Sequence, residues 1–309
     1  MMKPYRFAIL YALILIVIST GVLIDTFLIP HSLLVIEQDL TKEESTNLTN
    51  VLVNNETSVE VENRTVDEGI YTENTYVDEH LQINIQKVSK DGMVYYVADI
   101  ETDNPSLLKT ALANDTYGKN VTDATSNIAS AHNAIFAVNG DYYGFRNTGY
   151  VLRNGLLMRT TAGSSGTEAL VIDQEGDFSI VYESEVSAES LEAEGAAQII
   201  SFGPALVING EAAERITKNG VQNNPRTAIG QIDKGHYIFI VVDGRTSESR
   251  GATLSELAQI FLDYGCKTAY NLDGGGSATM WFNGEVINTP TDGRSFGERS
   301  VSDIVYFGY

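Results

Sequence analysis

The chain has 309 residues, 43% of them hydrophobic, so it is long enough to bury a core and is not a disordered polypeptide. Its 41 acidic residues against 20 Lys and Arg give a formal net charge of −21, which argues against a nucleic-acid partner. The single cysteine, Cys266, excludes an internal disulfide and a multi-cysteine metal site, and the four histidines lie far apart in sequence. We therefore expect any chemistry to rest on carboxylates, amides, hydroxyls and arginine.

The N-terminus carries the pattern of a membrane anchor. Residues 7–24 contain no charged side chain, and as a helix they would span about 27 Å. If the helix extends to Ile29, it is long enough to cross a bilayer. Lys3 and Arg6 precede this run and acidic residues follow it, so the positive-inside rule leaves the N-terminus in the cytoplasm. We predict a cytoplasmic tail (1–6) and an uncleaved signal anchor (7–29) in the cell membrane. A cleaved signal peptide is the alternative, although no Ala-x-Ala site follows.

The next segment has the composition of a solvated spacer. Between Glu37 and Glu79 there are 12 acidic residues against two basic ones, and we predict an acidic stalk over 30–79. From residue 80 onward, short apolar or alternating runs predict strands at 81–88, 94–100, 134–138, 169–172 and 205–208, with short helices at 124–132 and 189–194. The expected fold is α+β, a mixed sheet with short helices in one extracellular domain over 80–309.

The clearest local element is a helix that begins after Thr253. Thr253 and Glu256 form a capping-box pattern, apolar residues follow with helical spacing, and Gly265 stands where a helix commonly ends. Apolar runs at 237–242 and 268–272 flank this helix, which predicts a right-handed βαβ crossover with neighbouring parallel strands. Because ligands gather at the carboxyl ends of such strands, we expect Asp243 and Asp273 to face one cavity.

Two further strand ends add polar side chains to this picture. A turn at 233–236 predicts a hairpin of 227–232 with 237–242, and pairing Ile232 with Tyr237 sets Arg226 opposite Asp243. The strand at 134–138 is followed by an Asn-Gly-Asp-Tyr-Tyr run. Asp-Gly and Asn-Gly pairs are also ordinary turn sequences, so each is informative only in combination. The three glycines at 274–276 indicate close approach either to a ligand or to another chain segment.

Taken together, these motifs resemble the phosphodiester glycosidase family, which includes the lysosomal enzyme that removes N-acetylglucosamine from a sugar phosphodiester. The matching segments, in chain order, are 137–143, 149–155, 203–207, 224–230, 242–245, 271–280 and 298–303. The Asn-Leu-Asp-Gly-Gly-Gly-Ser and Pro-Arg-Thr-Ala blocks are the most specific. The resemblance runs from about residue 80 to 309 and leaves out the anchor and the stalk. Ser300 departs from it, because many relatives have proline there.

The resemblance implies cleavage of the bond between an anomeric carbon and a phosphate oxygen. Arg226, with Arg245 as the second candidate, would stabilise the departing phosphate, while Asp273 or Asp243 would attack the anomeric carbon or activate water. Polar neighbours would hold sugar hydroxyls or orient these acids, and the glycine amides would take phosphate oxygens. The predicted catalytic residues are Asp141, Arg226, Asp243 and Asp273; the predicted substrate-binding residues are Asn139, Tyr142, Arg245, Asn271, Gly274, Gly275, Gly276, Ser277 and Arg299.

Other functions remain open at this point. No cofactor is required and no metal ligand is predicted, although the Asp/Asn cluster is compatible with Ca²⁺ or Mg²⁺. One alternative is a metal-dependent phosphoesterase, and another is a non-catalytic carbohydrate-binding protein of the cell envelope. The predicted topology favours sugar phosphodiesters of envelope or exopolysaccharide glycans as substrates. Neither the sugar nor the oligomeric state follows from the sequence.

Overall fold

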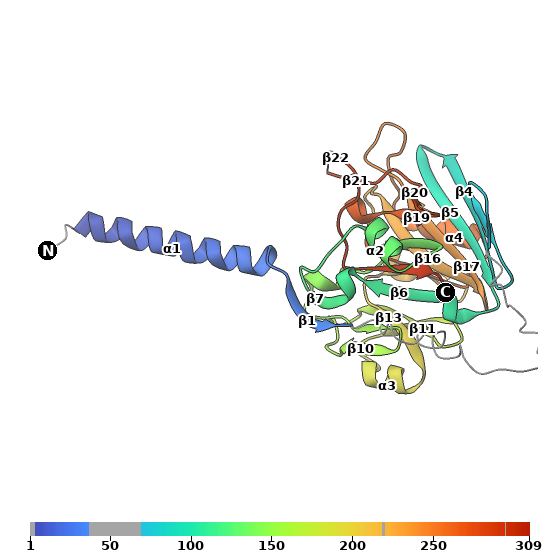
Figure 1. Ribbon diagram of the computed structural model, residues 1–309, viewed down its shortest axis with the longest axis horizontal. Coiled ribbons are helices and arrows are strands. Elements are labelled where there is room, and N and C mark those ends of the chain that lie inside the picture. The colour runs from blue at the N-terminus through green and yellow to red at the C-terminus, as the bar shows by residue number, and fades with distance from the viewer. Residues whose placement is uncertain (1–3, 37–68, 218–219, 294) are drawn as a thin grey trace, which may run out of the picture.

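A computed structural model describes residues 4–36, 69–217, 220–293 and 295–309 (Figure 1). The expected N-terminal helix is present as α1 (Pro4–Phe27), and its Ile9–Phe27 part, with mean hydropathy 2.2, is long and apolar enough to cross a membrane. Residues 37–68 of the predicted stalk lie outside the described residues. Strands nevertheless precede residue 80, because β1 (His31–Val35) pairs with β7 (Thr116–Lys119) and the largest sheet begins at Ile70.

Among the described residues, three larger sheets and two two-stranded sheets, all with antiparallel neighbours, make up the domain. The largest has the strand order β15-β14-β18-β16-β17-β5-β4-β3-β2. Its strands are β2 (Ile70–Tyr71), β3 (Thr75–Val77), β4 (Leu81–Lys90), β5 (Met93–Thr102), β14 (Ala205–Ile208), β15 (Glu211–Ala212), β16 (Arg226–Asp233), β17 (His236–Val242) and β18 (Thr268–Asn271).

The two five-stranded sheets have the orders β20-β19-β8-β23-β6 and β10-β9-β13-β11-β12. The first contains β6 (Leu108–Leu112), β8 (Phe136–Asn139), β19 (Met280–Phe282), β20 (Glu285–Val286) and β23 (Asp303–Phe307). The second contains β9 (Val151–Arg153), β10 (Leu156–Arg159), β11 (Glu168–Asp173), β12 (Phe178–Tyr182) and β13 (Ala196–Ile200). The described residues also form the pair β21 (Thr291–Asp292) and β22 (Ser295–Phe296), several short 3-10 helices, and the α-helices α2 (Thr125–Ala131), α3 (Ala188–Ala193) and α4 (Leu254–Asp263). The α+β architecture and its short helices are thus as predicted.

The main hydrophobic core joins the nine-stranded sheet to the sheet that contains β8 and β23. Phe239 of β17 packs edge-on against Phe136 of β8 and Phe307 of β23, with ring centroids 5.7 and 5.6 Å apart. All three rings are fully buried, and each contributes about 1.5–3 kcal/mol by leaving water. This packing fixes the position of β8 relative to the nine-stranded sheet.

The helix α4 connects β17 to β18, and its capping box is formed as predicted. Its Phe261 packs on β16 at Gly230, where a Cβ atom would lie only 2.7 Å from the ring. The two flanking strands run in the same direction, but the prediction that they are neighbours is wrong, because β16 lies between them and pairs antiparallel with both. Their carboxyl ends still reach the same edge of the sheet.

The predicted register of the hairpin is also wrong by one residue. Tyr237 pairs with Gln231 rather than Ile232, and Arg226 pairs with Val242 rather than Asp243. The reason is an irregularity between Gln231 and Asp233, where one residue is left out of the ladder. Because successive side chains on a strand point to opposite faces, a slip of one residue changes where Arg226 points relative to Asp243.

Candidate active site

The segments that follow β8 and β18 lie against each other. The Asp273 amide donates to the Gly140 carbonyl at 3.1 Å, and Asn139 Nδ2 donates to the Asp273 carbonyl at 2.6 Å. Asn139 is fully buried, and its Oδ1 accepts from Thr227 Oγ1 at 2.6 Å and from the Thr279 amide at 3.2 Å. The buried Asn139 side chain therefore positions the backbone of Asp273, and its predicted part in substrate binding stays a prediction.

A cavity of about 470 Å³ opens beside this junction. It is lined by Thr122, Asp141, Tyr142, Phe145, Asp273, Asp292, Glu298, Arg299, Ser300, Val301 and Ser302. Four residues predicted for the site, Asp141, Tyr142, Asp273 and Arg299, are in this lining. The cavity lining is acidic and contains Arg299, whereas Arg226, the arginine assigned to the departing phosphate from the resemblance, is not part of it.

Asp273 is 9% exposed and is held by three polar groups. Its Oδ1 accepts from the Gly274 amide at 2.8 Å, while Oδ2 accepts from Ser277 Oγ at 2.7 Å and from Arg299 Nη2 at 3.2 Å. Burial raises the pKa of Asp273 above its usual range, against the opposing effects of Ser277, Arg299 and Gly274. The carboxylate is therefore fixed in orientation and faces the cavity together with a cation.

Asp141 lines the cavity and also belongs to a buried ionic network. Arg146 Nη2 donates to Asp141 Oδ1, and Arg153 Nη2 lies 3.6 Å from Asp141 Oδ2. Arg153, 2% exposed, donates through Nε to Asp303 Oδ2 at 2.8 Å, and Asp303 Oδ1 accepts from the Asp141 amide at 2.7 Å. Burial raises the pKa of Asp303, which the Arg153 guanidinium opposes. Asp141 thus has two arginine partners that hold it in place.

Arg226 and Asp243 do not line this cavity. The Arg226 guanidinium donates from Nε to the Ala252 carbonyl at 3.1 Å and from Nη2 to the Gln222 carbonyl at 3.0 Å. Asp243 Oδ1 accepts from Asn288 Nδ2 at 3.0 Å and from the Thr289 amide at 2.9 Å, and burial raises its pKa. The prediction that Arg226 and Asp243 share a cavity with Asp273 is therefore wrong. Each side chain instead forms hydrogen bonds to a neighbouring loop.

The glycine loop after Asp273 is packed against protein on two sides. A Cβ atom on Gly274 would lie 2.8 Å from the Pro225 carbonyl, and one on Gly276 would lie 2.5 Å from Asp292 Oδ1. The Gly274 amide donates to Asp273 and the Gly275 amide donates to the Pro225 carbonyl at 2.9 Å. These two amides are already engaged, so the prediction that they receive phosphate oxygens is corrected. Packing explains why glycine is required at both 274 and 276.

Three other predicted residues surround this loop. Ser277 Oγ accepts from Arg299 Nε at 3.0 Å while it donates to Asp273, so it links the two charged groups. Asn271 Nδ2 donates to the Gly203 carbonyl at 2.8 Å, and its buried Oδ1 has no hydrogen-bond partner. Arg245 donates to Asn224 Oδ1 at 3.3 Å and to the Thr291 carbonyl at 3.4 Å. Ser277 supports the site directly, whereas Arg245 lies on the Gly275 side of the loop.

Several residues of the site are not predicted from the sequence. Phe145 stacks on Tyr142 with centroids 4.7 Å apart and an angle of 20°, and both rings are partly exposed at the cavity. Glu298 accepts from the Ser126 amide and hydroxyl, so it ties the cavity wall to α2. Arg146 lies outside the family-like segments and carries no local pattern that distinguishes a buried arginine from an exposed one. Arg153, Glu298 and Asp303 do lie in such segments, which is a usable signal.

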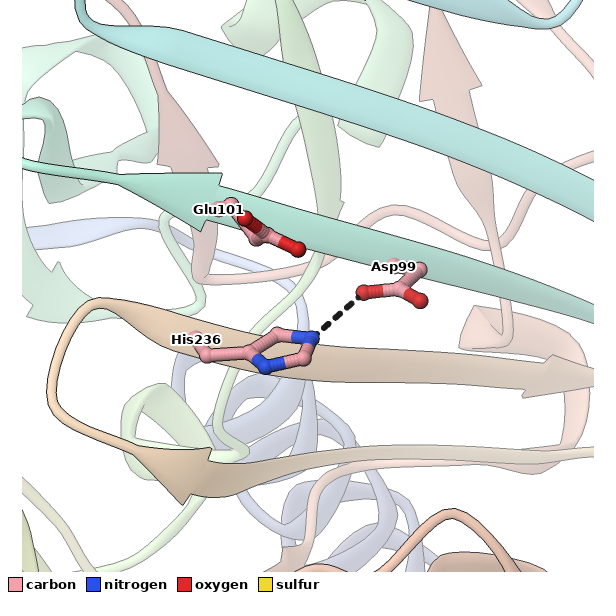
Figure 2. A group of neighbouring side chains, drawn as sticks. All are labelled: Asp99, Glu101 and His236. Atoms are coloured by element: carbon pink, nitrogen blue, oxygen red, sulfur yellow. Dashed lines mark hydrogen bonds and ion pairs between the residues drawn. The ribbon is translucent and has the colours of Figure 1, made fainter.

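One group of side chains elsewhere has spacing suitable for a metal ion. Within the described ranges, the carboxylates of Asp99 and Glu101 and the imidazole of His236 have atoms within 4.8 Å of one another (Figure 2). His236 Nε2 already makes a 2.8 Å hydrogen bond to Asp99. These residues lie on β5 and at the first residue of β17, the opposite end of that strand from Asp243. They are separate from the cavity that holds Asp273.

The sequence of this chain is similar to a known protein family and to individual proteins. A family model described as phosphodiester glycosidase matches residues 132–308. The SPbeta prophage-derived uncharacterized protein YomE of Bacillus subtilis (strain 168) is 32% identical over 202 residues, which cover 62% of this chain and 31% of that protein. Bovine (Bos taurus) N-acetylglucosamine-1-phosphodiester alpha-N-acetylglucosaminidase is 46% identical over 67 residues, 22% of this chain and 12% of that protein. The matches thus span about a third or less of these relatives.

Among solved structures, the catalytic domain of zebrafish N-acetylglucosamine-1-phosphodiester alpha-N-acetylglucosaminidase, auto-inhibited by its pro-peptide, superposes with a TM-score of 0.60. The match is 24% identical and covers 75% of this chain and 84% of that one. It establishes a shared fold. The family match ends one residue before the C-terminal Tyr309 and includes Asp141, Asp273 and Arg299.

Proposed function

Because the chain belongs to the phosphodiester glycosidase family, a family of hydrolases, we propose that it hydrolyses the bond between the anomeric carbon and a phosphate oxygen of a sugar-1-phosphodiester. The observation that carries this proposal is the pairing of Asp273 with Arg299 in one cavity. An anion and a cation side by side suit the two charges that develop as this bond breaks.

Asp273 acts at the sugar. An oxocarbenium-like transition state carries positive charge at the anomeric carbon, which a nearby carboxylate stabilises. Asp273 then either forms a bond to that carbon or removes a proton from the water that attacks it. In both cases a C–O bond to water oxygen replaces the C–O bond to phosphate. The contacts from Ser277, Arg299 and the Gly274 amide keep this carboxylate ionised and oriented.

Arg299 acts at the phosphate. The leaving phosphomonoester needs little protonation, so a fixed guanidinium can stabilise its negative charge in place of a general acid. The Arg299 side chain is 40% exposed, and its Nε and Nη2 are held by Ser277 while Nη2 also donates to the Gly274 carbonyl. These contacts limit its conformational freedom before substrate binds. The stacked Tyr142 and Phe145 rings offer an apolar face for the sugar ring.

The membrane-length helix supports an anchored enzyme whose catalytic domain lies outside the cell. The charge pattern leaves the N-terminus inside, because Lys3 and Arg6 precede the apolar Ile9–Phe27 part of α1 and acidic residues follow the helix. The substrates of such an enzyme are sugar phosphodiesters of the cell envelope or of exopolysaccharides. No cofactor enters these steps, and a divalent cation in the acidic cavity is an optional addition.

The test is incubation of the full chain with a panel of sugar-1-phosphodiesters, with free sugar and phosphomonoester measured together. We expect the two products in equal amounts, before and after exhaustive chelation. Activity lost on chelation and restored by Mg²⁺ or Ca²⁺ would favour a metal-dependent phosphoesterase. Binding of these compounds without turnover would favour a non-catalytic carbohydrate-binding protein.

A further inference from the structure

A second cavity, of about 130 Å³, lies where the domain meets the segment that follows α1. Lys119, Arg146 and Arg159 line it, together with Leu33 of β1 and the aromatic rings of Tyr117 and Tyr143. Three cations around one small cavity are unusual in a chain with a net charge of −21. No carboxylate is part of this lining.

The cations at this cavity exceed the carboxylates that could balance them. Arg146 and Arg153 are already paired with Asp141 and Asp303 in the buried network. Arg159 donates only to the carbonyls of Gly149, Tyr143 and Arg146, and within the described ranges neither it nor Lys119 has an ion pair. Burial lowers the pKa of Arg159; Tyr117 and Asp141 oppose this shift, while the charges of Arg146 and Arg153 add to it. The site therefore carries positive charge for which the described part of the protein supplies no partner.

Two guanidinium groups at the cavity also have unused donors. Arg146 Nε and Arg159 Nη2 are buried and make no hydrogen bond. A buried N–H without an acceptor destabilises the folded state, and a group with several acceptor oxygens removes that penalty. Phosphate oxygens match guanidinium donors in geometry and charge. The chemistry of this cavity is therefore that of a phosphate site.

The position of the cavity indicates where the phosphate comes from. Asn120, the residue after Lys119, donates through Nδ2 to the carbonyls of Thr26 and Ile29 at 3.0 and 3.1 Å, at the end of the membrane-length helix. β1 then pairs with β7, with His31 opposite Lys119 (Figure 1). These contacts hold the cavity at the end of the apolar helix, the level at which lipid headgroups lie in a bilayer.

We propose that the cavity lined by Lys119, Arg146 and Arg159 binds the phosphate group of an anionic membrane lipid. This inference rests on the proposed membrane anchoring, but not on the glycosidase reaction. Lipid binding there would hold the domain against the bilayer. It would also place the catalytic cavity near the membrane surface, because residues 141–146 contribute to both cavities and Arg146 contacts Asp141.

The experiment uses the full chain in nanodiscs of phosphatidylcholine, with and without phosphatidylglycerol, and measures hydrogen exchange of residues 116–120 and 143–147. We expect phosphatidylglycerol to protect both segments. One basic group near an anionic surface contributes about fivefold, and Lys119→Glu also adds an acidic group, so it should reduce this protection by more than about fivefold. Lys90→Glu, an exposed lysine at the end of β4, is the charge-matched control and should keep the protection. Arg159→Gln, with thermal unfolding as a check, provides a second variant.

A third arm adds inorganic phosphate to phosphatidylcholine discs. Equal protection by inorganic phosphate alone would overturn the assignment to a lipid, and no protection by either addition would overturn the anion site. Equal losses of protection in Lys119→Glu and Lys90→Glu would show that the general surface charge causes the protection, and would also overturn the proposal. Hydrolysis of a soluble sugar-1-phosphodiester by the same discs is measured in parallel, so that failure of the proposed reaction is distinguished from failure of lipid binding.

Discussion

Arg299 Nη2 lies 3.2 Å from Asp273 Oδ2, although the two residues are 26 positions apart in sequence. Ser277 contacts both, accepting from Arg299 and donating to Asp273. Their positions come from different parts of the fold, since Asp273 follows β18 and Arg299 precedes β23. This pair is the basis of the proposed mechanism.

We predict that Arg299→Gln lowers kcat by about 10²–10³-fold, because it removes the cation that stabilises the departing phosphate. Arg299→Lys should recover only part of the loss, since an ammonium group cannot donate in the bidentate geometry of a guanidinium. Steady-state kinetics on a sugar-1-phosphodiester would measure both. A smaller loss in Arg299→Gln than in Arg226→Gln would contradict this assignment and favour the sequence-based prediction of Arg226.

The pH dependence of the reaction should report Asp273. Its carboxylate must be ionised to act, and burial raises its pKa, so we expect an acidic limb in the rate at higher pH than an exposed aspartate gives. The charge of Arg299 opposes this rise, so Arg299→Gln should move the limb to still higher pH. Arg299→Lys keeps the charge and should leave the limb near its original position. A limb that stays in place in Arg299→Gln would show that another group titrates.

The buried network predicts a large effect on stability. Replacing Arg153 by Met leaves the carboxylates of Asp141 and Asp303 buried with one cation fewer, which should lower the free energy of unfolding by about 3–5 kcal/mol. Urea denaturation of the variant measures this change. Lys234→Met, which breaks an exposed pair with Glu175, is the matched control and should change the denaturation midpoint little. A similar small change in Arg153→Met would mean that the network contributes little to the fold.

Asp243 provides a test of a structural role against a catalytic one. Asp243→Ala removes the acceptor of the Thr289 amide and one of the two acceptors of Asn288 Nδ2, and we expect a loss of about 1–3 kcal/mol in unfolding free energy. Activity per folded molecule should fall far less than in Asp273→Asn. An equal fall in the two variants, both shown to be folded by circular dichroism, would restore Asp243 as a catalytic residue.

The sequence predicts this fold best where the signal is local. The capping box of Thr253 and Glu256 gives the start of α4 directly, and apolar or alternating runs of four to eight residues coincide with β4, β5 and β14. The convergence of the Asp141 and Asp273 segments is also predictable, because both follow buried strands. Local patterns are sufficient for these features since the residues that determine them are close in sequence.

Features that depend on distant contacts are not predictable in this way. The irregularity between Gln231 and Asp233 has no sequence mark, and it shifts the partner of Arg226 by one residue from the regular hairpin register. The burial of Arg153 depends on Asp303, 150 residues away, and an isolated arginine normally indicates surface. Our proposal that Arg299, rather than Arg226, acts at the phosphate likewise rests on contacts between residues far apart in sequence, those of Arg299 with Asp273 and Ser277.

The position of bond cleavage tests the central claim most directly. Hydrolysis of a sugar-1-phosphodiester by the full chain in water enriched in ¹⁸O leaves the isotope on whichever atom the water attacks. The mechanism predicts a phosphomonoester free of ¹⁸O, because water oxygen joins the anomeric carbon and the phosphate keeps its four original oxygens. An ¹⁸O atom in the phosphomonoester would show attack at phosphorus and would contradict the proposed roles of Asp273 at the sugar and Arg299 at the phosphate.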